Sequence, residues 1–190
     1  MPRMVTADYQ PFFTASVAAS SALIGLLFVS VSIAPGRIFG EGAEPRKQAQ
    51  AVSAFSALAN VFFISITSLI PGVLLGLVVT TVAAASSAQL LGLLVRAPVW
   101  RGHGVEILRG ALLFLVSALI YGTELYLGIE LWIKPASSGA LIGLLEVLLG
   151  GYAIGLGRAW QLLGAPRTGP VSGLLDLLER TRQGPPKPKA

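Results

Sequence analysis

Three glutamates fall within the last two long apolar segments of a chain of 190 residues. Glu124 and Glu130 belong to the stretch YGTELYLGIELWIKP at residues 121–135, and Glu146 belongs to the next segment. A carboxylate in such a segment either lies at a water boundary or is held by protein groups, because its transfer into hydrocarbon costs roughly 3 kcal/mol or more. An ionisable residue in this position is therefore a candidate for binding a proton or a cation.

The composition places the chain among membrane proteins. Hydrophobic residues make up 54% of the chain and charged residues 12%, whereas a soluble domain carries about 25% charged residues. The mean hydropathy is +0.74. Cysteine is absent and His103 is the single histidine, which excludes a disulfide framework, a thiolate metal site and haem held by two histidines. We expect neither a metal nor another cofactor.

Five segments are long enough to span a bilayer, whose core of about 30 Å takes about 20 apolar residues of helix. The run from Ala49 to Val95 is too long for one helix, and Pro71-Gly72 is a strong turn signal in its middle. The sequence predicts an all-α fold, with a five-helix transmembrane domain over residues 1–165 and a tail over residues 166–190. The spans are expected at about residues 11–33, 49–70, 72–95, 107–133 and 138–162.

The basic residues predict the orientation of this bundle. Twelve of the 14 lysines and arginines, with Arg158 in the C-terminal region among them, fall on one side of the membrane, and only Arg3 and Lys134 fall on the other. Lys and Arg accumulate in cytoplasmic loops. We therefore expect an N-terminus outside and a C-terminus in the cytoplasm, in a bacterial cytoplasmic (inner) membrane. This asymmetry accounts for the net charge of +5 without a nucleic-acid partner.

The tail contains the stretch PVSGLLDLLERTRQ, which predicts an amphipathic helix at about residues 172–182. Its leucines fall on one helical face and its charged residues elsewhere. Such a helix either lies on the cytoplasmic membrane surface or docks on a partner.

Small residues recur at helical spacing in the spans, and in lipid they let helix backbones approach closely. In the last span we expect Glu146 to point with the small residues into a helix contact or a cavity, and the leucine face to meet lipid. The small-residue stripe of this span is Gly139, Gly143, Gly150, Ala153 and Gly157, and the opposite face is Leu141, Leu144, Leu145, Leu148 and Tyr152. Further packing glycines are Gly25, Gly72 and Gly76, and one face of the fourth span carries Gly110, Ser117, Tyr121, Glu124 and Gly128.

Glu124 and Glu146 are about equally far from the turn at Lys134-Pro135. In an antiparallel hairpin this places both carboxylates roughly 10–15 Å below the outer surface, at 1.5 Å rise per residue. Two carboxylates at one site cannot both ionise readily, so one of them would hold a proton at neutral pH. Neither Lys nor Arg is expected inside the spans to neutralise them.

A polar layer from all five spans is predicted at this depth. Asn60 and Thr80 are about equally far from the Pro71-Gly72 turn, and Ser20 and Ser21 are similarly deep in the first span. The candidate proton- or cation-binding residues are Glu124, Glu146, Asn60, Thr80 and Tyr121. Alternatively, a protonated Glu146 is structural and hydrogen-bonds to Asn60, Tyr121 or a backbone carbonyl.

Glu130 is expected to differ from the other two glutamates. It lies beside Trp132 and Lys134 at the outer boundary, where aromatic and charged side chains anchor helices. We interpret it as a solvated anchor.

The stretches FFTASVAASSALIGLLFVSVSIAP and SAFSALANVFFISITSLIPG, within roughly the first seventy residues, resemble a group of small bacterial multi-spanning membrane proteins without assigned function. The resemblance implies a membrane fold and transfers neither an activity nor site residues. Sequence motifs of metalloproteases, serine hydrolases and nucleotide-binding proteins are missing, so no enzymatic activity is expected. Two hypotheses remain. The protein is an ion- or proton-conducting homo-oligomer that uses its glutamates, or it is an accessory or structural subunit of a larger membrane protein complex.

Overall fold

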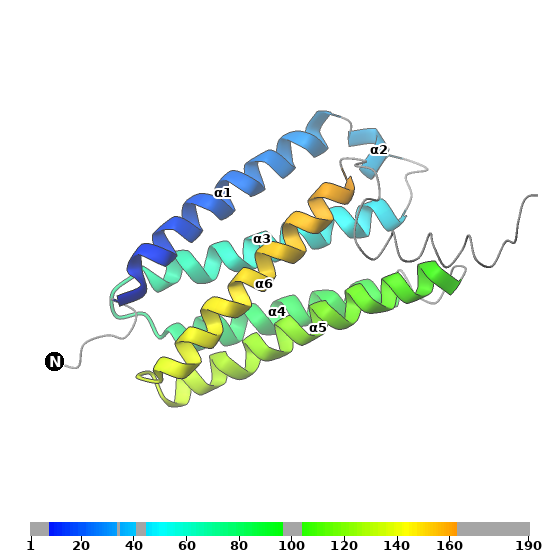
Figure 1. Cartoon of the computed structure of the whole chain (residues 1–190). Coiled ribbons are helices and arrows are strands. Elements are labelled where there is room, and N and C mark those ends of the chain that lie inside the picture. The colour runs from blue at the N-terminus through cyan, green and yellow to red at the C-terminus, as the bar shows by residue number, and fades with distance from the viewer. Residues whose placement is uncertain (1–7, 34, 41–44, 97–103, 163–190) are drawn as a thin grey trace, which may run out of the picture.

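The computed structural model describes residues 8–33, 35–40, 45–96 and 104–162 of the chain. These residues form helices and no strand (Figure 1). The helices within these ranges are α1 (Gln10–Ile33), α2 (Pro35–Phe39), α3 (Pro45–Ser68), α4 (Leu75–Arg96), α5 (Gly104–Ile133) and α6 (Ser138–Leu162). The amphipathic helix expected at residues 172–182 lies outside the described residues.

In the part of the chain that the structure describes, five helices are long and apolar enough to cross a membrane: α1, α3, α4, α5 and α6. The predicted all-α class and the five spans are therefore confirmed, and the protein is a multi-pass membrane protein. The short helix α2 was not predicted, because Pro35-Gly36 was interpreted only as the end of the first span. Proline is favoured at the first position of a helix, and here it begins a new one.

Two turns join spans at one end of the bundle, which we name the turn end. Between α3 and α4, Gly72 has a φ of 78°, a left-handed conformation that glycine adopts without steric cost. Between α5 and α6, the Ser137 hydroxyl accepts a hydrogen bond from the Ala140 backbone N–H at 3.3 Å, which caps α6. The same hydroxyl donates to Glu130 at 3.0 Å. Glu130, expected to be a solvated anchor, is half-buried and holds this turn.

Helix α3 is the centre of the bundle and packs against α1, α4 and α6, while α5 packs against α4 and α6. Figure 1 shows the turn end at the left and α2 at the right, at the opposite end of the bundle, which we name the loop end. The buried apolar side chains near the turn end form one cluster: Phe13, Val61, Ile64, Val79, Leu127, Leu131, Ala140, Leu141, Leu144 and Leu148.

The orientation of α6 about its axis differs from the expectation. Leu141, Leu144 and Leu148 are at most 1% exposed and face the core, whereas they were expected to face lipid. The reason lies in two glycines that were not singled out, Gly151 and Gly155. A Cβ at either would lie 2.8 Å from side-chain carbons of α3, so close packing of α6 on α3 uses this pair and turns the leucines inward.

Helices α4 and α5 also approach closely. A Cβ at Gly128 would lie 2.8 Å from the backbone nitrogen of Thr80, and one at Gly76 would overlap the backbone of Leu131 and Trp132. These contacts fix the antiparallel register of α4 on α5. Two further predicted packing glycines, Gly143 and Gly150, would place a Cβ 3.2 and 2.9 Å from side chains of α5. In contrast, no atom of a neighbouring element lies within 4 Å of the Cβ position of Gly25, Gly72, Gly139 and Gly157.

Candidate functional site

Three buried polar side chains from three helices meet in the middle of the bundle. The Asn60 amide nitrogen on α3 donates to the Ser86 hydroxyl on α4 at 3.0 Å. It also donates to both carboxylate oxygens of Glu124 on α5, at 2.9 and 3.2 Å. Glu124 is 1% exposed and Asn60 5%. We name Asn60, Ser86 and Glu124 the central polar site.

The local sequence explains why these side chains meet. Gly128 lies one helical turn from Glu124 on the same face of α5, and its lack of a side chain lets α4 approach. Buried polar groups in an apolar environment must be hydrogen-bonded to avoid a desolvation cost. Among the described residues, no buried side-chain nitrogen or oxygen lacks a hydrogen-bond partner. The site is therefore a satisfied network and not a packing defect.

A second polar contact, between Ser117 and Arg158, involves the same face of α5. Ser117, Tyr121 and Glu124 are four and three residues apart, and all three are buried. The Ser117 hydroxyl accepts a hydrogen bond from the Arg158 guanidinium of α6 at 2.7 Å. Tyr121 lies between Ser117 and Glu124 on this face. A row of polar groups thus runs from Glu124 toward the loop end.

Arg158 corrects the expectation that no basic residue lies inside the spans. The fifth span extends to Trp160, and Arg158 within it is only 9% exposed. Its positive charge is therefore part of the bundle interior and not of a cytoplasmic loop. Sequence reasoning missed it because Arg158 is near the end of the apolar run, where a charged residue usually marks the water boundary.

The two glutamates of the predicted pair lie at the same level but on different surfaces. The Cβ positions of Gly143 and Gly150 on α6 lie closest to Leu127 and Ile120 of α5, so Glu146, between these glycines, is level with the middle of that α5 segment, at Glu124. However, Glu146 is exposed, whereas Glu124 points toward α3. Within one chain they do not share a site, and Glu146 does not point into a helix contact as expected.

The predicted polar layer does not form across all five spans. The Thr80 hydroxyl donates to the Gly76 carbonyl at 2.7 Å, and Ser20 and Ser21 donate to carbonyls of their own helix. Ser86 takes the place expected for Thr80 beside Asn60. The physical reason is the turn, because α4 begins at Leu75 and not at residue 72, which moves a later residue level with Asn60.

A separate polar contact holds α1 to the bundle. The Tyr152 hydroxyl of α6 donates to the Ser16 carbonyl at 2.5 Å, and the Ser16 hydroxyl lies 2.9 Å from Tyr152 and 2.8 Å from Ser65 of α3. Tyr152 was expected on the lipid face. These groups join α1, α3 and α6 and have no ionisable carboxyl group, so we interpret them as structural.

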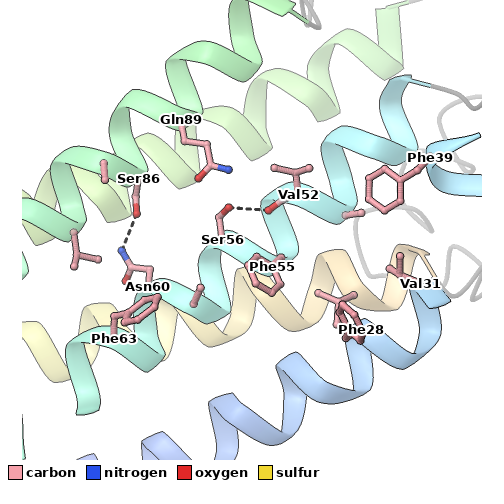
Figure 2. A pocket seen from close by; sticks show the side chains of 15 residues that line it. Phe28, Val31, Phe39, Val52, Phe55, Ser56, Asn60, Phe63, Ser86 and Gln89 are labelled. Atoms are coloured by element: carbon pink, nitrogen blue, oxygen red, sulfur yellow. Dashed lines mark hydrogen bonds between the residues drawn. The ribbon is translucent and has the colours of Figure 1, made fainter. Parts of the chain in front are cut away.

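A groove of about 570 Å³ lies beside the central polar site. Figure 2 shows Asn60, Ser86 and Phe63 at one end of it, and Phe55, Phe28 and Phe39 toward the other end. Side chains from four helices line it: Leu27, Phe28 and Val31 of α1, Phe39 of α2, Ala51, Val52, Phe55, Ser56, Ala59, Asn60 and Phe63 of α3, and Val82, Ala85, Ser86 and Gln89 of α4.

No protein-family model, curated protein or solved structure matches the chain. The resemblance of the first seventy residues therefore stays a prediction. The fold and the site define the class: a five-span helical membrane protein with a buried carboxyl group at the centre of its bundle.

Proposed function

We propose that the protein is a bacterial inner-membrane protein without enzymatic activity, in which Glu124 takes up and releases a proton as part of a proton-conducting homo-oligomer. One observation carries this proposal: a carboxyl group that is 1% exposed lies in the middle of a membrane span. Burying a charged carboxylate there is costly, and addition of a proton removes that cost. The group is therefore suited to hold a proton inside the membrane.

The contacts of Glu124 favour a proton over a metal cation. The group that faces the carboxylate is the amide nitrogen of Asn60, a donor that repels cations. Metal ions of the hard type prefer several oxygen ligands, and no cluster of three or more His, Cys, Asp or Glu residues occurs in the described ranges. A proton needs only one oxygen of the carboxyl group.

The surroundings of Glu124 support access from one side. Toward the loop end lie Tyr121, Ser117 and Arg158, whose polar groups can hydrogen-bond to water or to one another. Toward the turn end, Leu127, Leu131 and Leu144 belong to the buried apolar cluster. A proton that crosses the whole membrane must therefore leave Glu124 sideways. The carboxyl group of Glu146 lies at the same depth as Glu124 and is exposed. This position supports an oligomer in which Glu146 lies beside a neighbouring copy.

We further propose that the loop end faces the cytoplasm. Apart from Arg158, which is buried in the bundle, the loop regions on this side still carry nearly all the lysines and arginines of the chain. The turn end carries Lys134. The proton would then reach Glu124 from the cytoplasmic side.

The test is proton flux into proteoliposomes that contain a pH-sensitive dye, driven by a potassium gradient and valinomycin. We expect flux for the purified wild-type protein and at least tenfold lower flux for Glu124→Gln, which keeps the shape of the side chain and cannot be deprotonated. Thr123→Val, next to it on α5, is the matched control and should conduct as the wild type does. Wild-type flux in Glu124→Gln would contradict the proposal.

Glu146→Gln separates two routes in the same assay. A loss of flux as large as that of Glu124→Gln indicates that the proton passes between copies at Glu146. Unchanged flux indicates that Glu146 lies off the route.

The second candidate function is that of an accessory or structural subunit of a larger membrane complex. It is favoured by the exposed position of Glu146 on α6. A carboxyl group on the outer surface of a membrane span needs a polar partner, because burying it in lipid is costly. Purification in a mild detergent distinguishes the two. A stoichiometric second protein favours the accessory subunit, and a homo-oligomer alone favours the conducting protein.

A further inference from the structure

The groove beside the central polar site opens on the side of the bundle that faces lipid. Its apolar part includes four phenylalanines that are each between 47% and 68% exposed: Phe28, Phe39, Phe55 and Phe63. They come from α1, α2 and α3, as Figure 2 shows. The groove volume of about 570 Å³ lies in the range of sites that bind small organic molecules, roughly 300–1,000 Å³.

The groove ends on polar groups in the middle of the spans. All hydrogen bonds of Asn60 in the described structure use its amide nitrogen, so its amide oxygen remains available as an acceptor. The Ser86 hydroxyl accepts from Asn60 and retains its own proton for donation. Gln89 is exposed, and Figure 2 shows its amide directed toward α3. The groove therefore offers both donors and acceptors.

None of the described residues that line the groove carries a charged side chain. A phospholipid head group carries charge and stays at the membrane surface, so it does not match polar groups at this depth. A plain acyl chain matches the phenylalanines but makes no hydrogen bond to the Asn60 amide oxygen, the Ser86 hydroxyl proton or the Gln89 amide. The matching ligand has an apolar chain and an uncharged polar head that enters the bilayer core.

We propose that this groove binds an isoprenoid quinone. The flat ring would lie beside Phe63 and Asn60, where its carbonyl oxygens accept hydrogen bonds from Ser86 and Gln89. Flat aromatic side chains favour contact with a flat conjugated ring. The isoprenoid chain would follow Phe55, Phe28 and Phe39 along the groove toward lipid. This binding does not depend on proton conduction by Glu124.

The experiment is photolabelling of the full-length protein in nanodiscs with an azido derivative of decylubiquinone, followed by peptide mass spectrometry. We expect label on α3 and α4 residues that line the groove. Unmodified decylubiquinone should compete for labelling, whereas dodecanol, which has a chain of similar length and no ring, should not. Labelling confined to other helices, or no competition by decylubiquinone, would overturn the proposal.

Two variants test the polar contacts. Gln89→Leu and Ser86→Ala each remove one hydrogen-bonding group from the groove, and each should weaken competition by decylubiquinone roughly three- to tenfold. Thr81→Val is the matched control, because Thr81 is exposed on α4, donates to its own helix and does not line the groove. Gln89→Leu leaves all hydrogen bonds of Glu124 in place. Unchanged competition in Gln89→Leu and Ser86→Ala contradicts quinone binding at this end of the groove.

Other occupants give different results in the same experiments. Equal competition by dodecanol means that the groove binds acyl chains without selecting a ring. A disulfide between copies of Phe55→Cys, in a chain that otherwise lacks cysteine, means that a second copy fills the groove. Either result overturns the assignment to a quinone.

Discussion

The side-chain amide of Asn60 on α3 donates to both carboxylate oxygens of Glu124 on α5, across a helix interface at the centre of the bundle. The two residues are 64 positions apart in the chain. Neither side chain could remain buried at this depth without a polar partner, so each explains the position of the other. This pair is the starting point for the proton-binding proposal and for the first prediction.

A double-mutant cycle measures the coupling of this pair. Asn60→Ala and Glu124→Ala should each destabilise the protein, because each leaves a buried polar group without its partner, at a cost of about 1–3 kcal/mol. The double variant should be less destabilised than the sum of the two. We expect a coupling free energy of about 1–1.5 kcal/mol, near the upper end for interhelical hydrogen bonds in membranes. The measurement is reversible unfolding in mixed micelles.

The hydrogen bond between Arg158 and Ser117 should contribute to stability in a similar way. Ser117→Ala removes the acceptor at 2.7 Å from a buried guanidinium, and we expect a loss of about 1–2 kcal/mol in the free energy of unfolding. Ser21→Ala is the matched control. Ser21 is exposed and bonded to its own helix, so its loss should stay within about 0.5 kcal/mol. Equal effects of the two changes would contradict a stabilising role for the Arg158 contact.

The close approach of α4 and α5 predicts a difference between two glycines of one helix. A methyl group at Gly128 would lie 2.8 Å from the Thr80 backbone nitrogen, so Gly128→Ala should force the helices apart and cost about 1–3 kcal/mol. At Gly122 no atom lies within 4 Å of the new methyl group, so Gly122→Ala should be neutral or slightly stabilising. Thermal unfolding in detergent gives the melting temperature of each variant. Similar melting temperatures would contradict the close approach of α4 and α5 at Gly128.

The proposed orientation can be measured because the chain has no cysteine. Ala136→Cys lies exposed in the α5–α6 turn, and Gly36→Cys lies exposed in α2 with no atom within 4 Å of its Cβ. A maleimide that cannot cross membranes should label Ala136→Cys from the periplasmic side of the inner membrane. It should label Gly36→Cys only after the inner membrane is permeabilised. The reverse pattern would place the loop end outside.

The sequence predicted the spans well because their signal is local. A bilayer core requires about 20 apolar residues per helix, and that requirement is read from consecutive residues without knowledge of their neighbours. The same holds for the turn at Gly72, where the residue type itself permits a φ of 78°. The level of Glu124 and Glu146 also followed from counting residues to a shared turn, and the contacts of Gly143 and Gly150 agree with it.

The sequence predicted the rotation of each helix about its own axis less well. Helix α6 has two pairs of glycines at helical spacing, Gly143 with Gly150 and Gly151 with Gly155. The sequence does not say which helix each pair meets, because both pairs lie on an apolar helix and lipid accepts either face. In the structure Gly143 and Gly150 meet α5, and Gly151 and Gly155 meet α3. This contact buries Leu144 and leaves Glu146 exposed.

By itself, therefore, the sequence determined the class of the protein, the number of its spans and which carboxyl groups fall within them. The tertiary structure decided which carboxyl group is enclosed, and it gave Glu124 the partner Asn60. The physical reason is that hydrophobic length is a property of one segment. Enclosure of a side chain depends on the backbone approach of three other helices at once.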